Sequence, residues 1–347
     1  SLGVGSASGW ELCAPPSGGR RGAASLAAGL RRSLRPLRPT EMADHMIRAV
    51  AWGGRVRVAA CDATDTVEEL RRIHDPSPVT TAAVGRIATG ALLMASMLEK
   101  VTGREPMVTI EIDGGGPAGK LLATASPKGW VRAMVANPFA TAESRVNGKL
   151  NVAGVVGTAG EVIVTRDPGI GEPYRGVVPL VSGEIGQDLA RYLLDSEQTP
   201  SAVLLGVHVV PAGRVGHAGG LMVQLLPGVS DEEAERLSSR VRDLGAVTSQ
   251  MAVGVGPREW IESLFAEDLS VLDEGPVCFF CGCSERRVET ALMLLGAGEV
   301  RSMIEDCPEG PTVLHCGFCR KEYAVSVATL RRVLEEVESG AAGDRPN

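Results

Sequence analysis

Two closely spaced pairs of cysteines lie near the C-terminal end of the 347-residue sequence, Cys281-Gly-Cys283 and Cys316-Gly-Phe-Cys319, with 32 residues between them. Zinc in structural sites prefers four soft ligands in a tetrahedron, and two short-spaced thiol pairs brought together by an intervening fold supply such a set. Isolated buried cysteines would not cluster in this way. The sequence therefore predicts a zinc site whose ligands are Cys281, Cys283, Cys316 and Cys319.

Four thiolates on one dication leave a formal charge of −2, and such an electron-rich centre can react with oxidants. Peroxide or hypochlorite converts a reactive thiolate to a sulfenic acid, which then condenses with a neighbouring thiol to a disulfide. A disulfide within C-x-x-C forms readily, whereas one within C-x-C closes a small strained ring and is a reversible couple. Two interpretations stay open at this point: a redox-sensitive zinc centre, or an inert zinc ribbon that staples the C-terminus.

Further possible ligands lie close to the two pairs. Cys278 extends the first pair to C-x-x-C-x-C, so it could compete for zinc or pair with Cys281, and Cys307 offers another thiol. His315, next to Cys316, is a weaker candidate. Because four thiolates already fill a tetrahedron, we expect these three residues to lie outside the ligand set.

The sequence between and after the two pairs predicts a small domain that positions them. A helix capped by Ser284 should run to Leu295, and a second helix should cover 299–306. Strands over 312–314 and 323–327 should flank the second pair. Large apolar residues are few here, so metal binding should supply much of the folding free energy, which is on the order of 10 kcal/mol in zinc-finger peptides.

Upstream of the cysteines the pattern predicts a mixed core of strands and helices. Two strands joined by Gly53-Gly54 form an expected hairpin, and helical spacing of apolar residues marks two further stretches. Strands clustered around two helical stretches indicate an α+β core and not a repeating βαβ unit. The predicted strands are 47–52, 55–60, 107–112, 120–124, 130–135, 162–165 and 220–226, and the predicted helices are 79–100 and 182–196.

After Gly228 the sequence changes to charged helices with one narrow apolar stripe. Ser230 and Glu233 form a capping box, and a second helix should begin at Pro257. Such helices need a neighbour on which to lie, and from the residues alone they are a plain helical connector. The stripes consist of Ala234, Leu237, Val241 and Leu244 in the first helix and Trp260, Ile261, Leu264 and Phe265 in the second.

Composition and motif context argue against several classes of function. A net charge of −7 and only twelve aromatic residues are unlike a nucleic-acid binder, and no window has the roughly 18 consecutive apolar residues of a membrane-spanning helix. Gly114, Gly116 and Gly119 match a dinucleotide motif, but a strand, not a helix, is predicted after them, so we expect a hairpin turn and no nucleotide site. No nucleophile elbow or H-E-x-x-H motif indicates a hydrolase, and the protein is not expected to be an enzyme.

The first 41 residues carry six arginines against two glutamates and lack periodic apolar positions. We therefore expect residues 1–43 to be a disordered basic extension. A transit peptide has a similar composition, but an upstream extension without a targeting role is favoured, because ordered-looking sequence follows Met42 at once. The last ten residues, 338–347, are expected to be a disordered tail.

The cysteine motifs, with further segments upstream, resemble a known family. Phe280-Cys-Gly-Cys-Ser284 and His315-Cys-Gly-Phe-Cys319 look like the zinc centre of the bacterial redox-regulated heat-shock chaperones, the ATP-independent holdases of about 33 kDa. Tyr174-Arg-Gly-Val-Val178, Ser196-Glu-Gln198 and Ala218-Gly-Gly-Leu-Met222 also stand where that family has similar segments. The resemblance extends over 46–337, and the combination of C-x-C with C-x-x-C is highly specific to the family.

The resemblance implies a three-part protein: an α+β core (44–228), a metastable helical linker (229–276) and a zinc redox switch (277–337). In that family the reduced form holds one zinc ion per chain and is inactive. Oxidation there forms two disulfides, which here would join Cys281 with Cys283 and Cys316 with Cys319. Zinc then leaves, the linker loses order, and the protein, commonly a dimer, holds unfolding clients.

The apolar stripes of the linker offer a physical basis for such a switch, because released amphipathic sequence presents apolar surface to unfolded chains. The hypothesis assigns packing in the inactive form and client contact in the active form to Leu237, Val241, Leu244, Trp260, Ile261 and Leu264. Thiols poised as a metal site also suit a reducing compartment, so a cytoplasmic location is expected.

The main alternative is a constitutive zinc ribbon that recruits nucleic acid or a protein partner. It predicts a basic face near the zinc, but acidic residues outnumber basic ones in this region. A thiol oxidoreductase using Cys316 and Cys319 would need a thioredoxin-like βαβ context, which the sequence lacks.

Overall fold

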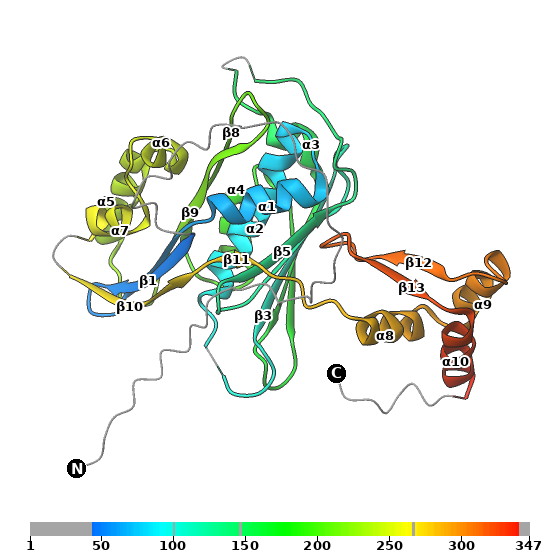
Figure 1. Cartoon of the computed structure of the whole chain (residues 1–347). Coiled ribbons are helices and arrows are strands. Elements are labelled where there is room, and N and C mark those ends of the chain that lie inside the picture. Colours follow the sequence, from blue (N-terminus) through cyan, green and yellow to red (C-terminus); the bar gives the residue numbers. More distant parts are fainter. Residues whose placement is uncertain (1–43, 100, 146–147, 266–267, 340–347) are drawn as a thin grey trace, which may run out of the picture.

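The computed structural model describes residues 44–99, 101–145, 148–265 and 268–339. The predicted basic extension, 1–43, and residues 340–347 of the predicted tail lie outside the described residues. Strands and helices mix within one core, with a small C-terminal part projecting from one side (Figure 1). The α+β class predicted from the sequence is confirmed.

The first sheet has five antiparallel strands in the order β10-β1-β2-β9-β8. The predicted N-terminal hairpin is its β1–β2 pair, and Gly53 and Gly54 in the turn both have positive φ, which suits glycine. The strand before the linker, β9, lies between β2 and the edge strand β8. The bounds are β1 (His45–Ala51), β2 (Val56–Asp62), β8 (Ser201–Val209), β9 (Val215–Leu225) and β10 (Leu269–Pro276).

The second sheet has six strands in the order β11-β5-β4-β3-β6-β7. The Gly-rich segment turns β3 back into the antiparallel strand β4, as the sequence predicted. Its glycines allow close backbone packing, since a Cβ on Gly114 would lie 2.4 Å from the carbonyl oxygen of Val156. The bounds are β3 (Met107–Gly115), β4 (Leu121–Ala125), β5 (Trp130–Val135), β6 (Gly157–Asp167), β7 (Tyr174–Pro179) and β11 (Cys278–Phe279).

Helix α2 (Pro78–Ala95) forms the centre of the main core and packs against both sheets. Ser77 caps its first turn by accepting a hydrogen bond from the Thr80 amide. The helix is long and apolar enough to span a membrane, but 89% of its residues are buried inside the protein, as in the core helix of a globular domain. Around it lie α1 (Thr64–His74), α3 (Val152–Val156) and α4 (Gly186–Asp195).

Helix α4 begins four residues later than the sequence predicted. The buried carboxylate of Asp188 accepts hydrogen bonds from the backbone amides of residues 181, 182, 183 and 185, which holds these residues in a loop before the helix. Ile185, at the start of the helix, has a positive φ of 71°. A local side-chain network therefore overrides the helical periodicity at this point.

Helices α5 (Asp231–Leu244), α6 (Val247–Ala252) and α7 (Pro257–Leu264) cover the outer face of the first sheet (Figure 1). The capping box of Ser230 and Glu233 is present, and α7 begins at Pro257 as predicted. The expectation of a wholly helical segment over 229–276 is wrong at its end, where β10 pairs with β1 along seven register positions. Half of the β10 residues are exposed and none is buried, so its sequence carries no apolar alternation that would have marked a strand.

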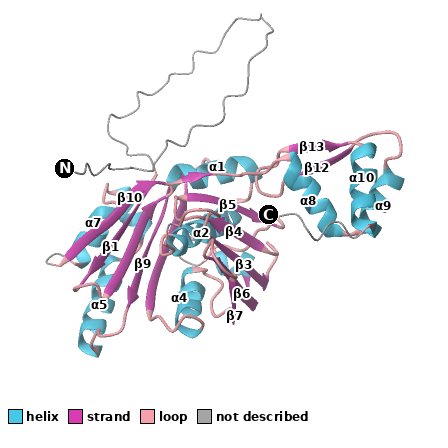
Figure 2. Cartoon of the chain, turned by 90° about the horizontal axis from the view of Figure 1, so that it is seen from below, coloured by secondary structure: helices cyan, strands magenta, loops and turns pink. Residues whose placement is uncertain are grey.

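The C-terminal part is a two-stranded hairpin packed with three helices (Figure 2). Its small apolar core contains Leu292, Val300, Val325, Leu330 and Val333. The predicted helices and strands are present, and they are followed by α10, a helix that was not predicted from the sequence. The bounds are α8 (Glu285–Leu295), α9 (Ala297–Asp306), β12 (Thr312–His315), β13 (Glu322–Val325) and α10 (Val327–Glu338).

Candidate metal centre

The four predicted ligands lie on two loops that meet beside strand β5. Cys281 and Cys283 are in the loop that leaves β11 and ends at the Ser284 cap of α8. Cys316 and Cys319 are in the turn that joins β12 to β13. This turn is closed by hydrogen bonds from the Cys316 amide to the Lys321 carbonyl (2.9 Å) and from the Arg320 amide to the Cys316 carbonyl (2.8 Å). Each pair is thus flanked by two elements, β11 and α8 for the first and β12 and β13 for the second.

The four sulfur atoms all lie within 4.8 Å of one another. The Cys281 and Cys316 sulfurs are 3.7 Å apart, and those of Cys283 and Cys319 are 3.3 Å apart. With zinc–sulfur bonds of about 2.3 Å, the edges of a tetrahedron would be about 3.8 Å long. The number, type and spacing of these donors therefore fit a tetrahedral zinc ion.

Backbone amides tune the thiols of the second loop. For Cys316, burial by itself raises the pKa, but hydrogen bonds from the backbone amides of Cys319 and Phe318 outweigh it and lower the pKa to about 7. Burial raises the pKa of Cys281 and of Cys319. Before metal binds, Cys316 is thus the thiol of these three that most easily becomes the thiolate.

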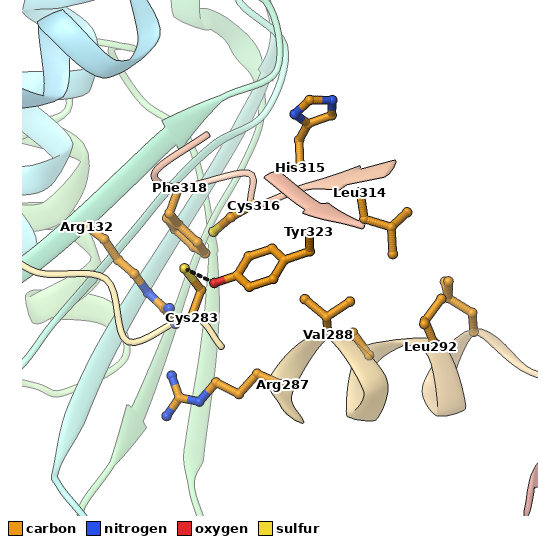
Figure 3. A pocket seen from close by; sticks show the side chains of 12 residues that line it. Arg132, Cys283, Arg287, Val288, Leu292, Leu314, His315, Cys316, Phe318 and Tyr323 are labelled. Carbon is orange, nitrogen blue, oxygen red and sulfur yellow. Dashed lines mark hydrogen bonds between the residues drawn. The ribbon is translucent and has the colours of Figure 1, made fainter. Parts of the chain in front are cut away.

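Tyr323 on β13 completes the immediate surroundings of the sulfurs. Its hydroxyl donates a hydrogen bond to the Cys283 sulfur at 3.0 Å (Figure 3). This hydrogen bond raises the pKa of Tyr323, so the hydroxyl keeps its proton and stabilises negative charge on the sulfur. Nothing in the cysteine motifs marks Tyr323, so its role could not be predicted from the sequence.

A cavity of about 420 Å³ opens beside the centre (Figure 3). Cys283 and Cys316 are part of its wall, so a small solute can reach these two sulfurs. Apolar side chains of α8 form one side, and Arg132 of β5 and Phe318 of the second loop form another. The Arg132 guanidinium lies 4.2 Å from the centre of the Phe318 ring, a cation–π contact that joins the second loop to the core.

The other cysteines near the two pairs, and the neighbouring histidine, do not join the sulfur cluster. Cys278 lies on β11, Cys307 is exposed at the C-terminal end of α9, and His315 is half-exposed, 3.8 Å from Glu322. Among the described residues, the four predicted cysteines form the one group of three or more side chains arranged to hold a metal ion.

The six residues proposed for client contact lie far from the sulfurs, in the second apolar cluster of the core. Leu237, Val241, Trp260, Ile261 and Leu264 are buried against the outer face of the first sheet, and Leu244 is partly buried at the edge of that cluster. The structure therefore places all six in packing contacts.

Comparisons with known proteins agree with the fold. Residues 44–326 match the family described as Hsp33 protein. The chain belongs to the Hsp33 family. Two Hsp33 relatives, both called 33 kDa chaperonin, are from Bacillus velezensis (38% identity, 84% of this chain and 99% of the relative) and Clostridioides difficile (40% identity, 85% and 100%). The crystal structure of the 33 kDa chaperonin from Thermotoga maritima, a heat shock protein 33 homologue, superposes with a TM-score of 0.75 at 30% identity, covering 85% of this chain and 99% of that one.

Family membership and the four-cysteine cluster together support a chaperone that binds a metal. Chaperonins as a class assist folding and are generally not enzymes, which agrees with the lack of a catalytic motif in the sequence.

Proposed function

We propose that the protein is a redox-regulated, ATP-independent chaperone that holds unfolding proteins after its zinc centre is oxidised. The observation that carries the proposal is the cluster of four sulfurs within 4.8 Å of one another in a chain of the Hsp33 family. One Zn²⁺ ion held by Cys281, Cys283, Cys316 and Cys319 would keep these sulfurs as thiolates and tie the two loops together.

The proposed oxidation consumes one peroxide for each pair of cysteines. A thiolate attacks a peroxide oxygen, the O–O bond breaks, and a sulfenic acid forms with release of hydroxide or water. The second thiolate of the pair then displaces the sulfenic oxygen as hydroxide, so that two sulfurs lose two electrons to one peroxide. The Tyr323 hydroxyl stabilises the Cys283 thiolate in the resting state, and the cavity beside it admits the peroxide.

We propose Cys281 with Cys283 and Cys316 with Cys319 as the disulfide pairs. The short sulfur–sulfur distances of the reduced centre join the two loops instead, Cys281 to Cys316 and Cys283 to Cys319. These distances are those of ligands around a common centre, and they last only while the two loops are held together. Once the loops separate, cysteines with only one or two residues between them keep the higher effective concentration. Mass spectrometry of the proteolysed, oxidised protein distinguishes the pairings, because a cross-loop disulfide would join two peptides.

The client-binding part of the proposal rests on helices α5–α7. They bury Leu237, Val241, Trp260, Ile261 and Leu264 against the first sheet, with Leu244 at the edge of the same cluster. Their release would expose these side chains together with the apolar outer face of the sheet, and such a surface attracts unfolded chains. We propose the same division into core, linker and switch that the resemblance implies, with a homodimer as the active form and the cytoplasm as the location.

The proposal is tested by following zinc release and aggregation of heat-denatured luciferase before and after peroxide treatment at mildly raised temperature. The expected result is that zinc leaves and that suppression of aggregation appears in parallel. Cys283→Ser should lose tight zinc binding, whereas Cys307→Ser, which removes an exposed thiol outside the cluster, should behave as the wild type.

Two outcomes would contradict the proposal. A constitutive zinc ribbon would lose a binding activity when oxidised and would not gain one. A thiol oxidoreductase would catalytically reduce or oxidise a disulfide substrate, and would do so without releasing zinc.

A further inference from the structure

The edge of strand β5 in the six-stranded sheet is covered by the segment that leads into the metal centre. The Cys278 amide donates to the Gly129 carbonyl, and the Phe280 amide donates to the Val131 carbonyl, both at 3.0 Å. The pairing is parallel and only two residues long. Residues of the zinc-binding part thus act as a short extra strand on the core.

Side chains reinforce this cover on both sides of the backbone contact. The rings of Trp130 and Phe280 lie 4.6 Å apart between their centres, and Phe318 packs against Arg132. Farther along β5, the next outward-facing carbonyl, that of Ala133, lies 3.0 Å from the Nε2 atom of His74, at the end of α1. The first part of the edge is therefore closed by the zinc-binding part, and the last part by the core itself.

Gly129 allows the close approach of the covering segment. It has a φ of 82°, and a Cβ at this position would lie only 2.1 Å from the Pro276 carbonyl oxygen. That contact is with backbone, which cannot move aside as a flexible side chain can. Any side chain at Gly129 would push the segment from Pro276 onward away from β5.

We propose that this edge of β5 is a docking site for an extended segment of an unfolded protein, which adds to the sheet once the zinc-binding part has moved away. The inference rests on the proposed function, because it needs the covering segment to be released. An exposed sheet edge pairs readily with extended chains, and an added strand gains main-chain hydrogen bonds whatever its sequence.

The occupant of the site is indicated by what covers it now. An extended piece of this chain fills the edge with backbone donors to Gly129 and Val131 and with an aromatic ring on Trp130. An unfolded protein carries the same backbone donors and exposes its aromatic residues. Because the resident strand is only two residues long, such a segment replaces it with little loss once zinc no longer holds the loop.

The first test uncovers the edge without oxidation. In the reduced, zinc-loaded protein, Gly129→Ala should raise the fraction of molecules whose β5 edge is uncovered by about tenfold, equivalent to 1.4 kcal/mol. Suppression of luciferase aggregation should appear in that form, with zinc content unchanged. Gly213→Ala is the matched control, since Gly213 lies in a turn at φ 79° with no atom within 4 Å of the added methyl group. The inference is overturned if the two variants behave alike.

The second test works on the oxidised wild-type protein and needs no folded variant. A peptide copying residues 275–282, with serine for Cys278 and Cys281, should compete with luciferase for the protein. The control peptide has the same side chains but N-methyl groups on the amides corresponding to residues 278 and 280, which removes the two donors. Equal inhibition by both peptides, or inhibition by neither, would overturn the inference.

The same measurements separate this inference from the function on which it rests. If the oxidised wild type does not suppress aggregation, the proposed function fails. If it does suppress aggregation, but neither Gly129→Ala nor the peptide has the expected effect, only the β5 docking site fails. Size-exclusion chromatography with light scattering of Gly129→Ala shows whether a second copy fills the edge; a stable dimer without luciferase binding also overturns the inference.

Discussion

Replacement of Trp260 by alanine tests whether the docking of α5–α7 keeps the chaperone inactive. Trp260 is fully buried between α7 and the first sheet, beside Ile261 and Phe265. Truncation of a buried tryptophan to alanine costs about 3 to 5 kcal/mol. The indole Nε1 has no hydrogen-bond partner among the described residues, so the substitution also removes an unsatisfied donor. We therefore expect the loss of stability to lie near the lower end of this range, at about 3 kcal/mol.

Most of this loss should fall on the docking of the three helices and not on the core as a whole. The eight-residue helix α7 is too short to be stable in water by itself, so it depends on its buried face. A loss of about 3 kcal/mol corresponds to roughly a hundredfold rise in the undocked population. Amide hydrogen exchange over 231–264 should accelerate by that factor in the reduced, zinc-bound protein, and aggregation of luciferase should be suppressed without oxidant.

The control for this prediction is Leu93→Ala, because Leu93 is buried on α2 in the main core. It should cost a similar free energy of unfolding, about 2 to 5 kcal/mol, without selectively accelerating exchange over 231–264. If both variants hold luciferase equally well, global destabilisation explains the activity. If Trp260→Ala accelerates hydrogen exchange over 231–264 but does not suppress luciferase aggregation, undocking of the linker does not control client binding.

Three further predictions concern the metal centre and the core. Tyr323→Phe removes the hydrogen bond to the Cys283 sulfur, so peroxide-driven zinc release should become about fivefold faster; Tyr174→Phe, which removes a hydroxyl contact to Ser196 on the core, should leave the rate unchanged. Removal of zinc by a chelator should melt α8–α10 and the β12–β13 hairpin while α2 stays protected from hydrogen exchange. If α2 lost its protection at the same time as the C-terminal part melted, that result would contradict a metal-supported C-terminal part. Burial raises the pKa of Asp44 to about 7, against the hydrogen bonds from Thr66 and Asp65 that lower it. Because the folded pKa lies above the unfolded value, this group's contribution to stability is fully present below about pH 4 and is lost as the pH rises towards 7; the difference in free energy of unfolding between wild type and Asp44→Asn should shrink over that range, and a constant difference would refute the assignment.

The sulfur site was predictable from the sequence because its information is local. Two thiol pairs, with one and two residues between their cysteines, supply four ligands for one zinc ion, and the fold had only to bring the two loops together. Tyr323 and Arg132 could not be predicted in the same way. Each reaches the site through a tertiary contact, and neither belongs to a motif that a single sequence reveals.

The core shows the same division between local and tertiary information. The N-terminal hairpin, helix α2 and the Gly-rich hairpin follow from turn residues and apolar periodicity. The predicted start of α4 was wrong because hydrogen bonds to the Asp188 carboxylate replace helical hydrogen bonds over the preceding residues. Strand β10 was missed because an exposed edge strand carries no apolar face, and its pairing with β1 depends on backbone contacts to a segment more than 200 residues away in the sequence.

Strand β10 also offers a route by which, under the proposed function, a change at the sulfur site would reach the helices on the far side of the core. It follows α7 at one end and continues into β11 and the metal centre at the other. Its side chains contribute little to holding it in place, because none of them is buried. Its ion pairs, Arg48 with Asp273 and Arg258 with Glu274, are partly solvent-exposed. The strand also has an irregular register between Arg48 and Ala49. Apart from its backbone pairing with β1, β10 is held by the docked helices at one end and by the covered β5 edge at the other. We therefore expect loosening at either end to let β10 fray towards the opposite one.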